Sequence, residues 1–116
     1  MEELSLDEML RFAAKVEKWD ETPFGYCGSV GGITVKIYGR LGLFSYKTVK
    51  AEINVKDYSD GEKPITLGEY QLSNDPDVLE AYEHAKKSYE ERHEQEELEK
   101  RRKSLEKARG LIKQGE

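Results

Sequence analysis

Thiol and imidazole groups, which serve most readily as nucleophile and general base near neutral pH, are rare in this sequence. Cys27 is the single cysteine, and His84 and His93 are the two histidines. No neighbour of Cys27 in the sequence would lower its pKa as a reactive cysteine requires, and no known nucleophile signature surrounds it. We therefore expect Cys27 to be a small packing residue in a strand, and we predict no catalytic residue.

Glu90 and His93 have the i, i+3 spacing of the carboxylate–imidazole pairs that hold iron in helical bundles. Such a site needs two of these pairs and further carboxylates, whereas one chain offers a single pair. A second copy could supply another, but a solvated charged helix face is the better interpretation. We predict no metal and no other cofactor.

Residues 25–32 contain four glycines and resemble a phosphate-binding loop only superficially. The segment lacks the Lys-Ser/Thr pair of a P-loop, and a strand rather than a helix is expected to follow it. Turn formation is therefore the favoured role of these glycines.

Composition limits the chain to one small core. Of 116 residues, 36% are hydrophobic and 37% are charged, the net charge is -5, and the mean hydropathy is -0.84. We therefore expect a thin core and a segment outside it. No apolar run reaches ten residues, so no membrane span is predicted. A single cysteine cannot form an internal disulfide, and the acidic N-terminus does not resemble a leader, so we expect a cytoplasmic protein.

The N-terminal segment has the pattern of an amphipathic helix over residues 5–19. Ser5 and Glu8 form a capping box, and Leu4 and Met9 could form the accompanying hydrophobic staple. We expect Thr22-Pro23 to end the helix, because the residue before proline avoids the α region.

Residues 24–73 have the composition of short strands joined by turns. Gly31-Gly32 predicts a hairpin before a strand at 33–38, and residues 44–56 alternate in polarity. The residues expected on the buried side of that second strand are Val49, Ala51, Ile53 and Val55. Asp60-Gly61 predicts another hairpin, and Pro64 predicts that the strand at 65–72 lies at an edge. The result is an antiparallel meander of three or four strands.

A long helix is predicted from Pro76 to about Arg109, since no strong helix breaker occurs before Gly110. Its first half has apolar residues at helical spacing, whereas residues 90–97 offer no apolar face. The fold class is therefore α+β, with the order α-β-β-β(-β)-α. We expect residues 1–89 to form a compact core and residues 90–116 to project from it or to be partly disordered.

Three apolar residues, Leu98, Leu105 and Ile112, recur every seven residues in the second half of this helix. We call them the apolar stripe. Residues 75–97 carry nine acidic and three basic residues, a balance of -6, and residues 98–116 carry three acidic and seven basic residues, a balance of +4. We expect the stripe to bind a protein partner or a second copy, and four cations would steer an acidic surface toward it. These cations are Lys100, Arg101, Arg102 and Lys103. The sequence thus predicts a non-catalytic interaction module.

Single-stranded nucleic-acid binding is the alternative function. Residues 22–58 carry five basic and two acidic residues, a balance of +3, and aromatic side chains alternate with the cations. Aromatic rings stack on bases, and cations bind phosphates. The candidate residues on this predicted sheet face are Lys36, Tyr38, Arg40, Phe44, Tyr46 and Lys50. Polar strand formers on a wet face, or aromatic residues packed under the long helix, would explain the same pattern.

Overall fold

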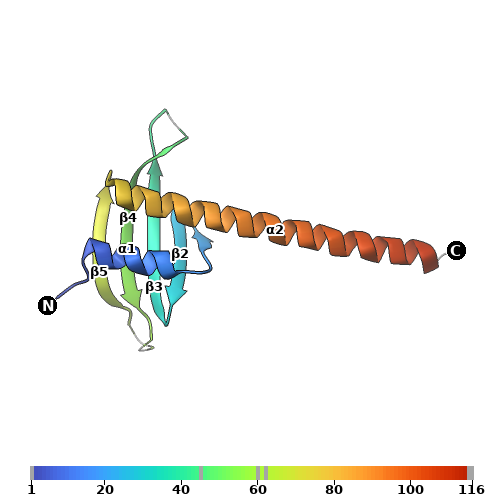
Figure 1. Ribbon diagram of the computed structural model, residues 1–116, viewed down its shortest axis with the longest axis horizontal. Helices are drawn as coiled ribbons and strands as arrows, with labels where there is room; N and C mark the ends of the chain where they lie inside the picture. Colours follow the sequence, from blue (N-terminus) through green and yellow to red (C-terminus); the bar gives the residue numbers. More distant parts are fainter. Residues whose placement is uncertain (1, 45, 60, 62, 115–116) are drawn as a thin grey trace.

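The computed structural model describes residues 2–44, 46–59, 61 and 63–114. Two helices pack against a five-stranded antiparallel sheet, so the chain has the predicted α+β fold (Figure 1). The elements in chain order are α1 (Leu6–Lys15), β1 (Asp20–Thr22), β2 (Gly25–Val30), β3 (Ile33–Leu41), β4 (Thr48–Asp57), β5 (Ile65–Ser73) and α2 (Pro76–Gln114).

The sheet is a simple meander, because each strand pairs with the next one along the chain. Gly31 and Gly32 both have positive φ angles, +57° and +82°, and they make the predicted tight hairpin between β2 and β3. Strand β5 lies at an edge of the sheet, as Pro64 predicted.

Both helices pack on the same face of the sheet and run across its strands (Figure 1). The core lies between the helices and this face, and its side chains alternate along the strands because successive side chains point to opposite faces. The buried core residues from the two central strands are Val35, Ile37, Ala51, Ile53 and Val55. We call the uncovered side of the sheet the open face.

Helix α1 begins as predicted and ends earlier than predicted. The Glu8 amide donates to Ser5 Oγ at 3.1 Å, and the Ser5 amide donates to Glu8 Oε1 at 3.0 Å, so the capping box is confirmed. The helix ends at Lys15, and Val16 is already extended. Val16 and Trp19 are buried at helical spacing, but they lie in the irregular segment that follows the helix. The prediction of a helix over 5–19 was therefore too long.

Strand β1 explains the difference in strand number. It has three residues and pairs with β2, giving five strands where three or four were expected. The sequence signal of Thr22-Pro23 marks the end of this strand rather than the end of a helix. A strand of three residues is too short to show an alternating pattern.

The second predicted strand begins later than expected. Strand β4 starts at Thr48, and Phe44 lies in the hairpin that precedes it. Val49, predicted to be buried, is 43% exposed, because it lies near the start of β4, before the residues that pair with β5. Of the predicted Asp60-Gly61 turn, Gly61 has the expected positive φ of +75°, and Asp60 lies outside the described residues.

Helix α2 has the predicted start but continues past the predicted end. The Asp77 amide donates to Asp75 Oδ1 at 2.9 Å, so Asp75 is the cap. The helix continues through Gly110 to Gln114, which gives a length of about 58 Å at 1.5 Å per residue. The radius of gyration is 19.1 Å, against about 13 Å for a compact domain of this length, so the helix projects far beyond the core (Figure 1).

Candidate functional site

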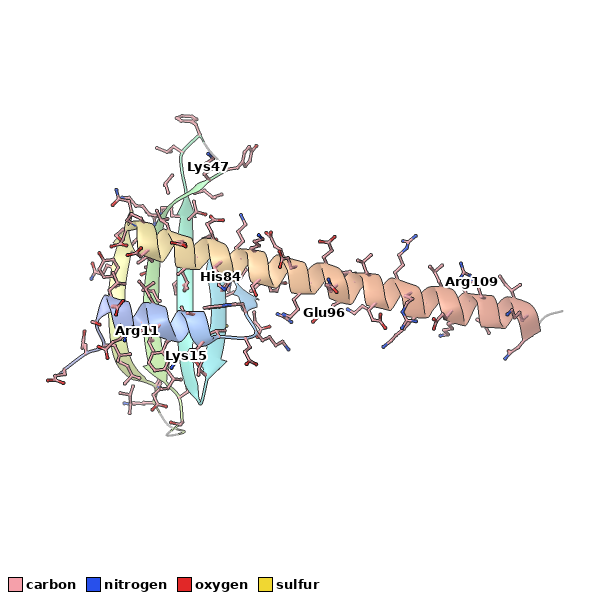
Figure 2. The ribbon with its side chains drawn as sticks, viewed as in Figure 1. Arg11, Lys15, Lys47, His84, Glu96 and Arg109 are labelled. Carbon is pink, nitrogen blue, oxygen red and sulfur yellow. The ribbon has the colours of Figure 1, made fainter. Side chains whose placement is uncertain are left out.

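The part of α2 that leaves the core is exposed along its whole described length. Every residue from His93 to Gln114 is exposed, and we call this segment the arm. The side chain of Arg109 lies near the end of this segment, and Glu96, close to its beginning, pairs with Arg92 at 3.1 Å (Figure 2). Within the apolar stripe, Leu98 is 60%, Leu105 is 44% and Ile112 is 64% exposed. The arm thus presents the three aliphatic side chains that the sequence singled out.

The apolar stripe faces away from the sheet. The residues of α2 that pack on the core include Val78, Ala85 and Tyr89. At about 100° of rotation per residue, Leu98 and Leu105 lie on the side of the helix roughly opposite to these residues. The sheet and α1 therefore do not obstruct a second helix that approaches the stripe.

The four predicted steering cations lie along the exposed arm, and two of them form ion pairs within it. Arg102 binds Glu99 and Glu106 at 2.6 Å each, and Lys100 lies 3.9 Å from Glu97. The hydrogen bond from Arg102 lowers the pKa of Glu99. Such exposed pairs contribute little to stability, but they leave the arm with an ordered charge pattern beside the stripe. Arg101 and Lys103 are likewise exposed.

Arg92 holds α2 to the core where the arm begins, and sequence reasoning missed it. Its guanidinium donates to the carbonyl of Trp19 and, at 3.1 Å, to Asp20 Oδ1. It also lies 5.6 Å from the centre of the Tyr89 ring. A lone cation among acidic neighbours was the only signal in the sequence, and it does not identify contacts more than 70 residues away.

Four of the six candidate nucleic-acid residues share the open face. The register pairs Lys36 with Asn54, Tyr38 with Glu52, and Arg40 with Lys50. These side chains alternate with the buried residues of β3 and β4, so they point away from the helices. The structure therefore brings Lys36, Tyr38, Arg40 and Lys50 to one surface.

Phe44 and Tyr46 do not lie in that row. Both are in the hairpin between β3 and β4, at its tip, and they are 102% and 97% exposed. Lys47 lies on the same hairpin, which extends past α2 (Figure 2). The aromatic residue beside Lys36 is instead Tyr58, whose ring centre lies 5.7 Å from the Lys36 ammonium. A hydrogen bond with Tyr58 raises the pKa of Lys36.

The groups with catalytic or ligating chemistry are scattered. Burial raises the pKa of the Cys27 thiol, and strand alternation places Cys27 on the open face, away from the histidines of α2. His93 stacks on Tyr89, with ring centres 5.7 Å apart. Among the described residues, no three His, Cys, Asp or Glu side chains are grouped to hold a metal ion, so Glu90 and His93 have no further ligand there.

The described part of the chain contains no helix that is long and apolar enough to cross a membrane. Comparisons of the chain with protein-family models, curated proteins and solved structures give no match.

Proposed function

We propose that this chain is a non-catalytic protein–protein interaction module that binds through the arm. The single observation that supports this function most is the projection of the arm, with its apolar stripe on the side facing away from the sheet. A helix with an unpaired apolar row is the form in which proteins present an i, i+7 anchor pattern to a partner.

Energetics favour a binding role over a purely structural one. The arm contributes no buried side chain to the core, since the buried residues of α2 are Val78 and Ala85. Most of the stability of helices in proteins comes from packing of an apolar face rather than from helix propensity, and the arm has no such packing within its own chain. Contact with another chain would bury the stripe and stabilise the arm in its helical form.

Substitution of the stripe tests this proposal. Leu98→Glu with Leu105→Glu should leave the domain folded and abolish its association, measured by sedimentation equilibrium together with thermal unfolding. Leu111→Glu is the matched control, because Leu111 is 60% exposed on the same helix but lies about 100° around it from Ile112. Association of the double variant at wild-type strength would refute the proposal, and so would unfolding of the double variant, since the stripe would then belong to the core.

Single-stranded nucleic-acid binding is a second candidate, favoured by the cluster of Lys36, Arg40 and Lys50 on the open face. The nearby hairpin tip, with Tyr46, could stack on bases. If this function holds, affinity for an oligonucleotide should fall with rising salt, and Tyr46→Ala should cost about 1–3 kcal/mol of binding free energy. Absence of binding to single-stranded oligonucleotides at low salt would exclude it.

A further inference from the structure

A groove between α1 and α2 forms a second surface that sequence reasoning did not identify. It has a volume of about 550 Å³. Apolar side chains from both helices, among them Leu10, Ala14 and Ala81, line it, together with the buried indole of Trp19. Eight of its nine lining residues belong to α1 and α2, which lie on one face of the sheet (Figure 1), so a helix could approach the groove without meeting the sheet.

The rim of the groove is acidic. Asp7 from α1 and Asp77 and Glu80 from α2 line it, and His84 lies at one end. Asp7 is paired with Arg11 at 2.8 Å, whereas Glu80 is an exposed carboxylate one turn from Asp77. The groove therefore has an apolar floor with negative charge beside it. A partner that fits it would have a row of apolar side chains with positive charge beside the row.

The arm has this complementary composition. Its apolar stripe is flanked by Arg101, Arg102 and Arg109, and residues 98–116 have a balance of +4. We propose that the groove between α1 and α2 binds the arm of a second copy of this chain. This inference rests on the proposed function of the arm and names its partner.

Helix geometry makes the contact reciprocal. Glu80 and Leu98 are 18 residues apart, or about five turns, so they lie on the same face of α2. In the first half of α2, this face is acidic and lies beside the groove. In the second half of α2, the same face is apolar and basic. Two copies with antiparallel α2 helices place each arm over the other copy's groove, which gives a closed two-fold dimer.

Direct contact between two stripes is disfavoured by charge. If two arms paired with each other, in parallel or antiparallel orientation, two segments with a net charge of +4 each would lie side by side and repel. Binding in the groove instead places these cations beside Asp77 and Glu80. Glu91 and Glu94 come near the two-fold axis, and their repulsion limits the affinity. We therefore expect a transient dimer with a dissociation constant in the range of about 1–100 µM.

The experiment uses two forms of the full chain with altered charge. The first is Ala14→Lys with Glu80→Lys, at two exposed positions, which changes the net charge of the groove lining from -3 to 0. The second is Arg101→Glu with Arg109→Glu, which changes the net charge of residues 98–116 from +4 to 0 and leaves the ion pairs of Arg102 intact. Each form alone should dimerise more than about tenfold more weakly than the wild type, because both of its groove–arm contacts lose their charge complementarity. An equimolar mixture should recover part of the dimer, because the basic arm of the first form then meets the acidic groove of the second.

The outcomes separate the two proposals. Recovery in the mixture, measured by sedimentation equilibrium at concentrations up to about 300 µM, supports the groove as the binding site. If Leu98→Glu with Leu105→Glu abolishes the dimer but Ala14→Lys with Glu80→Lys does not, the groove proposal is wrong and the arm's function stands. A wild-type chain that remains monomeric also overturns the groove proposal. A dimer that survives the stripe substitutions overturns both.

Discussion

Deletion of residues 98–116, which contain the apolar stripe, should leave the core intact. Deleting residues 98–116 removes no buried side chain, because the described residues of this segment are all exposed. The hydrophobic contribution to the free energy of unfolding is therefore nearly unchanged. The new helix end would carry Glu96 and Glu97 beside the negative end of the helix dipole, which costs up to about 1 kcal/mol. Such a loss lowers the thermal midpoint by less than about 8 °C in a domain of this size.

Deletion of residues 89–116 serves as the comparison for this change in thermal midpoint, and it should lower the midpoint further. It removes the Tyr89 ring, whose centre lies 5.6 Å from that of Tyr26, and the contacts of Arg92 with Trp19 and Asp20. Partial burial of a tyrosine and these hydrogen bonds together contribute about 2–4 kcal/mol. Both forms are followed by circular dichroism during heating. A fall of more than about 8 °C in the shorter deletion would show that residues 98–116 stabilise the core, contrary to this expectation.

Three further predictions concern the core. Arg92→Met should lower the free energy of unfolding by about 1–3 kcal/mol in chemical denaturation, since the Trp19 carbonyl and Asp20 lose their donor; an unchanged midpoint would contradict this. Gly39→Ala should destabilise the fold by about 1–3 kcal/mol, because a Cβ there would lie 2.5 Å from the Tyr82 ring, whereas Gly110→Ala, with open space around it, should not. Burial raises the pKa of Tyr26 to about 12, above the ordinary value of 10.0, so the native state binds its proton more tightly and stability should fall as pH rises from 10 to 12; Tyr26→Phe should remove this fall.

Local signals in the sequence predicted the starts and turns of the elements. The Ser5–Glu8 capping box, the Gly31-Gly32 hairpin and the cap at Asp75 each depend on residues within a few positions of one another. Such contacts form wherever their short segment occurs, so the sequence alone identifies them.

The features that the sequence did not predict, such as the end of α1 and the start of β4, depend on contacts between distant segments. Val16 and Trp19 have helical spacing, yet the chain leaves the helix at Lys15 so that β1 can pair with β2. Phe44 and Tyr46 belong to an alternating pattern, yet they lie in a hairpin because β3 and β4 part before reaching them. In these cases the pairing of strands overrides local periodicity.

For the same reason, the sequence predicted the apolar stripe but not the groove. The apolar stripe depends on spacing within one helix, so Leu98, Leu105 and Ile112 could be identified from the sequence. The groove depends on α1 and α2 lying side by side, which brings Ala14 and Ala81 together across 67 positions. No periodicity within either helix encodes that approach.

Amide hydrogen exchange along α2, measured at low and high protein concentration, shows directly whether the arm contacts a second copy of the chain. If the arm binds a second copy of the chain, protection of residues 98–114 should rise with concentration, while protection of residues 78–85, in the core, should stay constant. Equal protection of residues 98–114 at every concentration would contradict this binding, because the arm would then gain no contact with a second copy.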